Sequence, residues 1–128
     1  MKSFVLHAFS MMLICFAALA HSAEVPFDQA KFDAARAAGK PVAVVFHADW
    51  CPTCRAQAPV LKDLAQTPDF KSLTLFVANF DTEKALKKVL NVTQQSTIVV
   101  FKNGKEIARS TGDTQKGILA DLLKHAVS

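Results

Sequence analysis

The sequence is poor in cysteine and in net charge, and each shortage excludes a class of protein. Three of its 128 residues are cysteine, whereas small scaffolds held together by disulfides need several pairs. The formal net charge is only +4 and the basic residues are scattered, which argues against a nucleic-acid-binding protein. Internal repeats and low-complexity linkers are also absent, so the length predicts one globular domain.

Long hydrophobic runs are scarce too, apart from one near the start of the chain. Residues 4–20 are almost wholly apolar, follow the positive charge of Lys2 and precede small residues. This pattern predicts a secretory signal peptide over residues 1–23, with another possible cleavage site after Ala20. A retained membrane anchor is the alternative, but the run is shorter than the roughly 20 residues that span a bilayer. The folded domain is then predicted over residues 24–128.

Loss of the signal peptide would leave only two cysteines. Cys15 would be removed, and Cys51 and Cys54 would remain in a mature chain of about 105 residues, which is long enough to bury a core without disulfides. We therefore expect a protein that is periplasmic or secreted, in a compartment where structural disulfides are made and repaired.

The two remaining cysteines lie two residues apart, in the run Trp-Cys-Pro-Thr-Cys at residues 50–54. An apolar segment typical of a buried strand precedes this run, and a segment with helical spacing follows it. A Cys-x-x-Cys pair at a strand-to-helix junction indicates a redox site first and a metal site second. The free N–H groups and the dipole at the start of a helix favour a thiolate on Cys51, which lowers its pKa below the free-thiol value of about 8.5.

Hydrophobic periodicity and turn residues predict the other elements. The expected helices span 27–38, 51–65, 83–90 and a segment that starts after 114, and the expected strands span 42–46, 73–80, 97–101 and 106–110. Asn103-Gly104 predicts a tight hairpin turn, and Asp81 or Thr82 is expected to cap the helix at 83–90. One strand–helix–strand crossover followed by a hairpin predicts an α/β fold with a mixed four-stranded sheet and helices on both faces.

Several features of this order recur together in one known family. They are the approach Phe-His-Ala-Asp-Trp-Cys-x-x-Cys at 46–54, Pro59 in the next helix, the strand end Asn-Phe-Asp at 79–81, the hairpin at 101–105 and Gly112 before the last helix. With these features the chain resembles the thioredoxin family over its whole mature length, and the resemblance implies the thioredoxin fold.

The resemblance also implies roles for the residues of the motif. Cys51 would be the exposed attacking thiolate and Cys54 the buried resolving thiol, and the two would form the redox-active disulfide Cys51–Cys54. Trp50 would shield Cys51 and form part of the docking surface, or only pack. Pro52 suits an early helix position, where no N–H partner is lost, and Pro52 and Thr53 together would tune the redox potential.

The chain departs from the family pattern beside the motif. Ser96 stands where the family has a cis-proline, so the Gln95–Ser96 bond is expected to be trans or strained. The Ser96 hydroxyl could bond a thiolate, or a shifted loop could simply tolerate serine. Val45 and Val77 replace the family's buried carboxylate and its lysine neighbour. His47 replaces an aromatic residue and either moves protons or only packs and bonds solvent.

The function expected is that of a periplasmic thiol:disulfide reductase of protein disulfides. The resemblance implies recharging by a membrane electron carrier of the DsbD or CcdA kind, and we expect a monomer that needs no cofactor or metal. A disulfide oxidase or isomerase is the alternative, and a non-catalytic binding module is a weaker one. A Cu or Zn module, with His47, Cys51 and Cys54 as ligands, is a further alternative without an evident fourth ligand.

Overall fold

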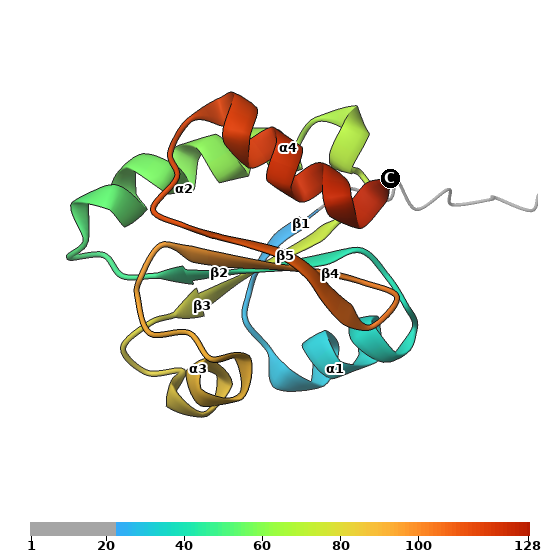
Figure 1. The fold of residues 1–128 in the computed structure, drawn as a ribbon, viewed down its shortest axis with the longest axis horizontal. Helices are drawn as coiled ribbons and strands as arrows, with labels where there is room; N and C mark the ends of the chain where they lie inside the picture. Colours follow the sequence, from blue (N-terminus) through green and yellow to red (C-terminus); the bar gives the residue numbers. More distant parts are fainter. Residues whose placement is uncertain (1–22) are drawn as a thin grey trace, which may run out of the picture.

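A five-stranded sheet between two layers of helices forms the protein (Figure 1). The computed structural model describes residues 23–128, so the predicted signal peptide lies almost wholly outside the described residues and stays a prediction. The strands are β1 (Ala23–Pro26), β2 (Val42–His47), β3 (Thr74–Asn79), β4 (Thr97–Lys102) and β5 (Lys105–Thr111). They lie in the order β1-β3-β2-β4-β5, in which β1, β3 and β2 are parallel and β4 and β5 are antiparallel to their neighbours.

The prediction of four strands was wrong, because β1 adds a fifth at the edge of the sheet. Val25 of β1 pairs with Phe76 of β3, and the N–H of Phe27 continues the ladder to the carbonyl of Val77 at 2.9 Å. The strand has four residues and ends in Pro26, so it is too short to show an alternating pattern. A proline is tolerated there because an edge strand leaves one row of backbone groups unpaired.

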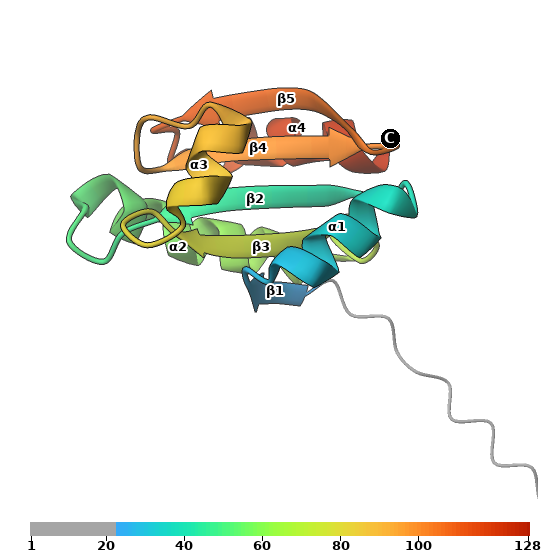
Figure 2. The same ribbon diagram turned by 90° about the horizontal axis from the view of Figure 1, so that it is seen from below.

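The helices cover both faces of the sheet, as predicted. Helices α1 (Gln29–Ala37) and α3 (Lys84–Leu90) lie on one face, and α2 (Pro52–Ala65) and α4 (Lys116–Val127) lie on the other (Figures 1 and 2). A single 3-10 turn, η1 (Pro68–Phe70), follows α2. Within residues 23–128 no helix is both long and apolar enough to cross a bilayer.

Strand β2 explains why the apolar run at 42–46 is continuous. Val44 and Phe46 pack in the core beneath α1 and α3, whereas Ala43 and Val45 pack in the core beneath α2 and α4. Successive side chains of a strand point to opposite faces, so a strand with a helix layer on each side needs apolar residues at every position.

Two local predictions had different outcomes. The Asn103-Gly104 hairpin is confirmed, with positive φ angles of 52° and 78°, as a turn that matches the strand twist requires. The predicted cap of α3 was wrong, because Glu83 is the N-cap residue and no side chain caps this helix. The N–H groups of Asp81 and Thr82 instead donate to the side-chain oxygen of Asn79, at 2.9 and 3.2 Å.

Candidate active site

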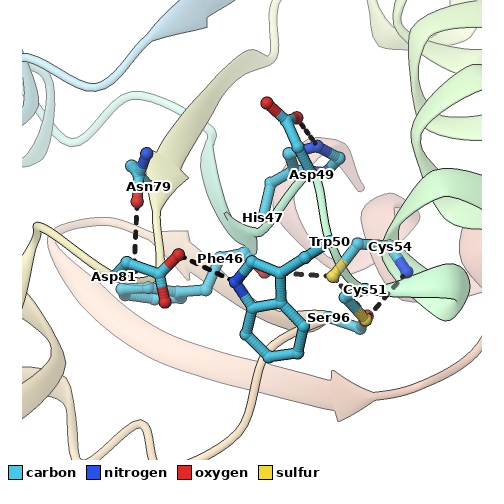
Figure 3. A network of polar contacts seen from close by, with 9 residues as sticks. All are labelled: Phe46, His47, Asp49, Trp50, Cys51, Cys54, Asn79, Asp81 and Ser96. Atoms are coloured by element: carbon cyan, nitrogen blue, oxygen red, sulfur yellow. Dashed lines mark hydrogen bonds and ion pairs between the residues drawn. The ribbon is translucent and has the colours of Figure 1, made fainter.

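The cysteine motif lies where β2 ends and α2 begins, at the carboxyl end of the parallel strands (Figure 3). Cys51 is the N-cap residue of α2, and its sulfur accepts a hydrogen bond from the N–H of Cys54 at 3.3 Å. Pro52 occupies the first helical position, where its missing N–H costs no hydrogen bond. The local sequence therefore fixes the Cys51 sulfur against the positive end of the helix.

This geometry separates the pKa values of the two thiols. Burial raises the pKa of the Cys51 thiol, but hydrogen bonds from the Cys54 N–H, the Cys54 thiol and the Ser96 hydroxyl outweigh it. With a further bond from the Thr53 N–H, the pKa of Cys51 is lowered to about 7. Burial raises the pKa of Cys54, a change that the Ser96 hydroxyl opposes and that nearby Cys51 reinforces. Near neutral pH the dithiol therefore holds one ready nucleophile and one protonated thiol.

The expectation of an exposed Cys51 was wrong. Cys51 is 3% exposed and Cys54 is 1% exposed, and both thiols are free. The capping bond turns the Cys51 sulfur back toward the helix, and Ala48 and partly buried Phe80 pack around the pair. Cys51 nevertheless lines a groove of about 240 Å³, through which a substrate sulfur can approach it.

The groove is built from uncharged polar residues. Thr53 and Gln95, two of the predicted supporting residues, line it beside Cys51, and so does Ser96, which is buried. Gln94, Thr111 and Gly112 complete the lining. Sequence reasoning missed these last three. Thr111 and Gly112 reach the cysteines only through the hairpin between β4 and β5, whereas Gln94 adjoins the predicted Gln95 in the loop before β4.

Ser96 touches both sulfurs. Its hydroxyl lies 2.8 Å from the Cys54 sulfur and 3.7 Å from the Cys51 sulfur. The peptide bond before it is trans, and its φ of 60° is in the left-handed region, which costs a non-glycine residue roughly 1–3 kcal/mol. Two backbone hydrogen bonds help to hold this conformation: the Ser96 N–H donates to the Phe46 carbonyl at 2.8 Å, and the Ser96 carbonyl accepts from the N–H of Gly112 at 3.1 Å.

Gln57 supports Ser96 from behind, and sequence reasoning missed it. The side chain is 1% exposed, and its amide nitrogen donates to the carbonyl of Ser96 at 3.3 Å and to the carbonyl of Asp113 at 2.8 Å. The available signal was a polar residue three positions after Cys54, on the face of α2 that otherwise carries apolar side chains.

Trp50 is held at the surface next to the motif. Its indole N–H donates to the carboxylate of Asp81 at 2.8 Å (Figure 3), and 58% of the residue is exposed. An anchored, exposed aromatic ring is typical of a docking surface. The predicted docking role is therefore compatible with its position and stays a prediction.

His47 faces away from the chemistry. Its Nε2 lies 2.9 Å from the carboxylate of Asp49, and the ring is turned toward that residue in Figure 3. Among residues 23–128 no group of three or more His, Cys, Asp and Glu side chains is arranged to hold a metal. The ligand set of His47, Cys51 and Cys54, on which the metal alternative depended, is therefore not formed.

Apolar side chains occupy the space behind Cys54. Val45 and Val77, the replacements for the family's buried pair, line a cavity of about 100 Å³ together with His47 and Gln57. Of the described residues, only Glu24 of β1 brings a carboxylate to this lining, and Glu24 is exposed. No buried carboxylate is therefore in place there to take the proton of Cys54.

Comparisons with known proteins agree with this geometry. The sequence model of the Thioredoxin family matches residues 23–125. Thioredoxin of Chlamydia pneumoniae is 35% identical over 96 residues, which are 74% of this chain and 91% of that protein. Thioredoxin H4 of Arabidopsis thaliana is 30% identical over 95 residues, 74% of this chain and 79% of that protein. The crystal structure of Trxlp from Edwardsiella tarda EIB202 superposes with a TM-score of 0.77 at 42% identity, covering 79% of this chain and 98% of that one.

Proposed function

The chain belongs to the thioredoxin family of thiol:disulfide oxidoreductases, and we propose that it works as a reductase of protein disulfides outside the cytoplasm. Cys51 is the attacking group and Cys54 the resolving group. The observation that carries this assignment is the Cys51 sulfur, which caps α2, has a pKa of about 7 and lines the groove. Cys54 lies behind it, more deeply buried and with a raised pKa.

The reaction proceeds in two exchanges. The Cys51 thiolate attacks one sulfur of the substrate disulfide, a bond forms between them, and the second substrate sulfur leaves and takes up a proton. Cys54 then attacks the Cys51 sulfur and releases the first substrate sulfur as a thiol. The substrate gains two electrons and the protein keeps the disulfide Cys51–Cys54. Trp50 and the groove residues Gln95 and Thr53 contact the incoming chain.

The pKa of Cys51 favours reduction over oxidation. A thiolate that is strongly stabilised makes the reduced form stable and the disulfide a strong oxidant, as in DsbA, where the corresponding pKa is about 3.5. Thioredoxin, a reductant, has a value of about 7, and Cys51 matches the reductant. This supports a reductase rather than the alternative of an oxidase or isomerase.

The location and the electron donor follow from the signal peptide predicted over residues 1–23. A reductase in the periplasm has to receive electrons across the membrane, so we assign the donor to carriers of the DsbD or CcdA kind. The protein then cycles as a monomer between this donor and its oxidised substrates, and most of it is reduced in the cell.

Two measurements test this function. Equilibration with redox buffers should give a potential near the thioredoxin value of about −270 mV, whereas a value near −120 mV would place the protein with the oxidases. Rapid alkylation of cells should find Cys51 and Cys54 mostly as free thiols, and a fully oxidised pair would refute the reductase. The variant Cys54→Ser should accumulate mixed disulfides with substrate and donor on Cys51, and the double variant with Cys51→Ser is the matched control that should trap neither.

A further inference from the structure

The Cys54 thiol has few neighbours that can take its proton. Apart from Cys51, its sulfur lies near three polar groups: the Ser96 hydroxyl at 2.8 Å, the Phe46 carbonyl oxygen at 4.0 Å and the backbone N–H of Ala48, which can only donate. A carbonyl only accepts hydrogen bonds, whereas a hydroxyl both accepts and donates. Among the polar contacts of Cys54 that the structure describes, only Ser96 can therefore receive one proton while it gives up another.

The position of Ser96 suits such an exchange. Its hydroxyl is also 3.7 Å from the Cys51 sulfur, and Ser96 lines the groove by which a substrate reaches that sulfur. In the mixed disulfide the substrate sulfur is bonded to Cys51, about 2 Å further along the line of approach. Ser96 then lies beside the row of sulfurs, in contact with the thiol that has to lose a proton and on the wall of the groove by which the sulfur that has to gain one enters.

We propose that the Ser96 hydroxyl relays a proton from Cys54 to the departing substrate sulfur in the second exchange. The Cys54 sulfur attacks the Cys51 sulfur, their bond forms, and the bond between Cys51 and the substrate breaks with its electron pair on the substrate sulfur. The Cys54 proton passes to the Ser96 oxygen, and the hydroxyl proton of Ser96 passes to the substrate sulfur. Ser96 ends unchanged, the substrate sulfur is reduced, and the dithiol is oxidised.

The proton relay rests on the proposed function in one respect: it assumes that Cys51 and Cys54 carry out disulfide exchange. It runs backwards when the protein acts as an oxidant, so it does not depend on the direction of electron flow. A failure of Cys51 to attack any disulfide would contradict the proposed function, whereas a failure of the relay affects only the second exchange. The two exchanges therefore have to be timed separately.

Two small disulfides allow the first and second exchanges to be timed separately in a stopped-flow experiment with the reduced protein. One is the symmetrical disulfide of thionitrobenzoate, and the other is the mixed disulfide of thionitrobenzoate with glutathione. In both, attack by Cys51 releases coloured thionitrobenzoate and times the first exchange. The second exchange then expels either thionitrobenzoate or glutathione, and Trp50, the only tryptophan, reports closure of the Cys51–Cys54 disulfide by its fluorescence.

The leaving group distinguishes a proton relay from a structural role. An aryl thiol of low pKa leaves as a thiolate and needs no proton, whereas glutathione, an alkyl thiol, leaves slowly unless it is protonated. Ser96→Ala should therefore slow the expulsion of glutathione by roughly 10- to 100-fold, at or below the lower end of the usual range for general acid–base catalysis. Expulsion of thionitrobenzoate should change several-fold less.

Two further variants keep the test decisive. Ser96→Gly removes the hydroxyl and suits a φ of 60°, so it should show the same leaving-group dependence in a relaxed loop. Glu24→Gln removes the carboxylate at the rim of the cavity behind Cys54 and should leave both rates unchanged. The relay is overturned if Ser96→Ala slows both leaving groups equally or neither, if Ser96→Gly does not share its effect, or if Glu24→Gln alone slows the second exchange.

Discussion

The buried amide of Gln57 offers a sharp test of how the site is held together. Replacement of Gln57 by leucine keeps the side chain close to its original size and removes its ability to form hydrogen bonds. The residue is 1% exposed, and its two acceptors are backbone carbonyls in the two loops that face the cysteines, those of Ser96 and Asp113. The substitution therefore separates these loops from α2 without opening a large cavity.

The size of the expected loss in stability depends on which hydrogen bonds each of the two carbonyls keeps. The Ser96 carbonyl still accepts from the N–H of Gly112 at 3.1 Å, so its loss is small. The part-buried Asp113 carbonyl loses its 2.8 Å bond from Gln57, and an unsatisfied buried group costs about 1–3 kcal/mol. We expect Gln57→Leu to lower the free energy of unfolding by about 2 kcal/mol. For a domain of this size that lowers Tm by roughly 8 to 16 °C.

Urea unfolding of the reduced protein, followed by circular dichroism, measures this change. The matched control is Gln66→Leu at the end of the same helix, where the glutamine is exposed and the change should stay within about 0.5 kcal/mol. A loss at Gln57 that is no larger than the loss at Gln66 would refute the reasoning. So would a variant with the expected loss but an unaltered rate of the second exchange, because a loosened Ser96 should also slow that step.

Three further predictions concern the neighbouring residues. Alkylation of Cys51 by iodoacetamide should be half-maximal near pH 7 and should fall as the pH falls, because the thiolate becomes protonated; a midpoint above about 8.5, the free-thiol value, would contradict the capping geometry. Trp50→Phe removes the bond to Asp81 and should change stability by only about 1 kcal/mol, while the KM for a protein disulfide rises and that for a small disulfide does not. Val45→Asp places a carboxyl in a site that is 4% exposed, where burial raises its pKa above the unfolded value of about 3.9. The free energy of unfolding of this variant, relative to wild type, should therefore be highest below pH 4. It should fall as the pH rises, by about 1.4 kcal/mol per pH unit up to the pKa of the carboxyl in the folded protein. Equal urea midpoints at pH 4 and pH 8 would show that the site is solvated.

Much of the fold could be predicted because single elements carry their own patterns. The unbroken apolar run of β2 requires a helix layer on each side, and Asn103-Gly104 determines the hairpin. Strand β1 has no such pattern, since its four residues gain their place only by pairing with β3. The cap of α3 was missed for a similar reason, because Asn79 bonds the turn that leads into the helix and leaves Glu83 as an N-cap without a side-chain bond.

The site was predictable where it depends on local chemistry and not where it depends on loops meeting across the fold. The spacing of Cys51 and Cys54 at a helix start is enough to predict one activated thiol. The burial of Cys51 arises only when Ala48 and Phe80 pack around the pair, and the role of Gln57 only when the loops at Ser96 and Asp113 meet α2. These features are linked. Because Val45 stands in place of a carboxylate, the proton of the Cys54 thiol leaves on the side of the groove. The Ser96 hydroxyl meets the proton there, and this position requires a strained backbone at Ser96. Gln57 helps to hold that backbone, so the buried amide and the missing carboxylate belong to one arrangement for moving the same proton.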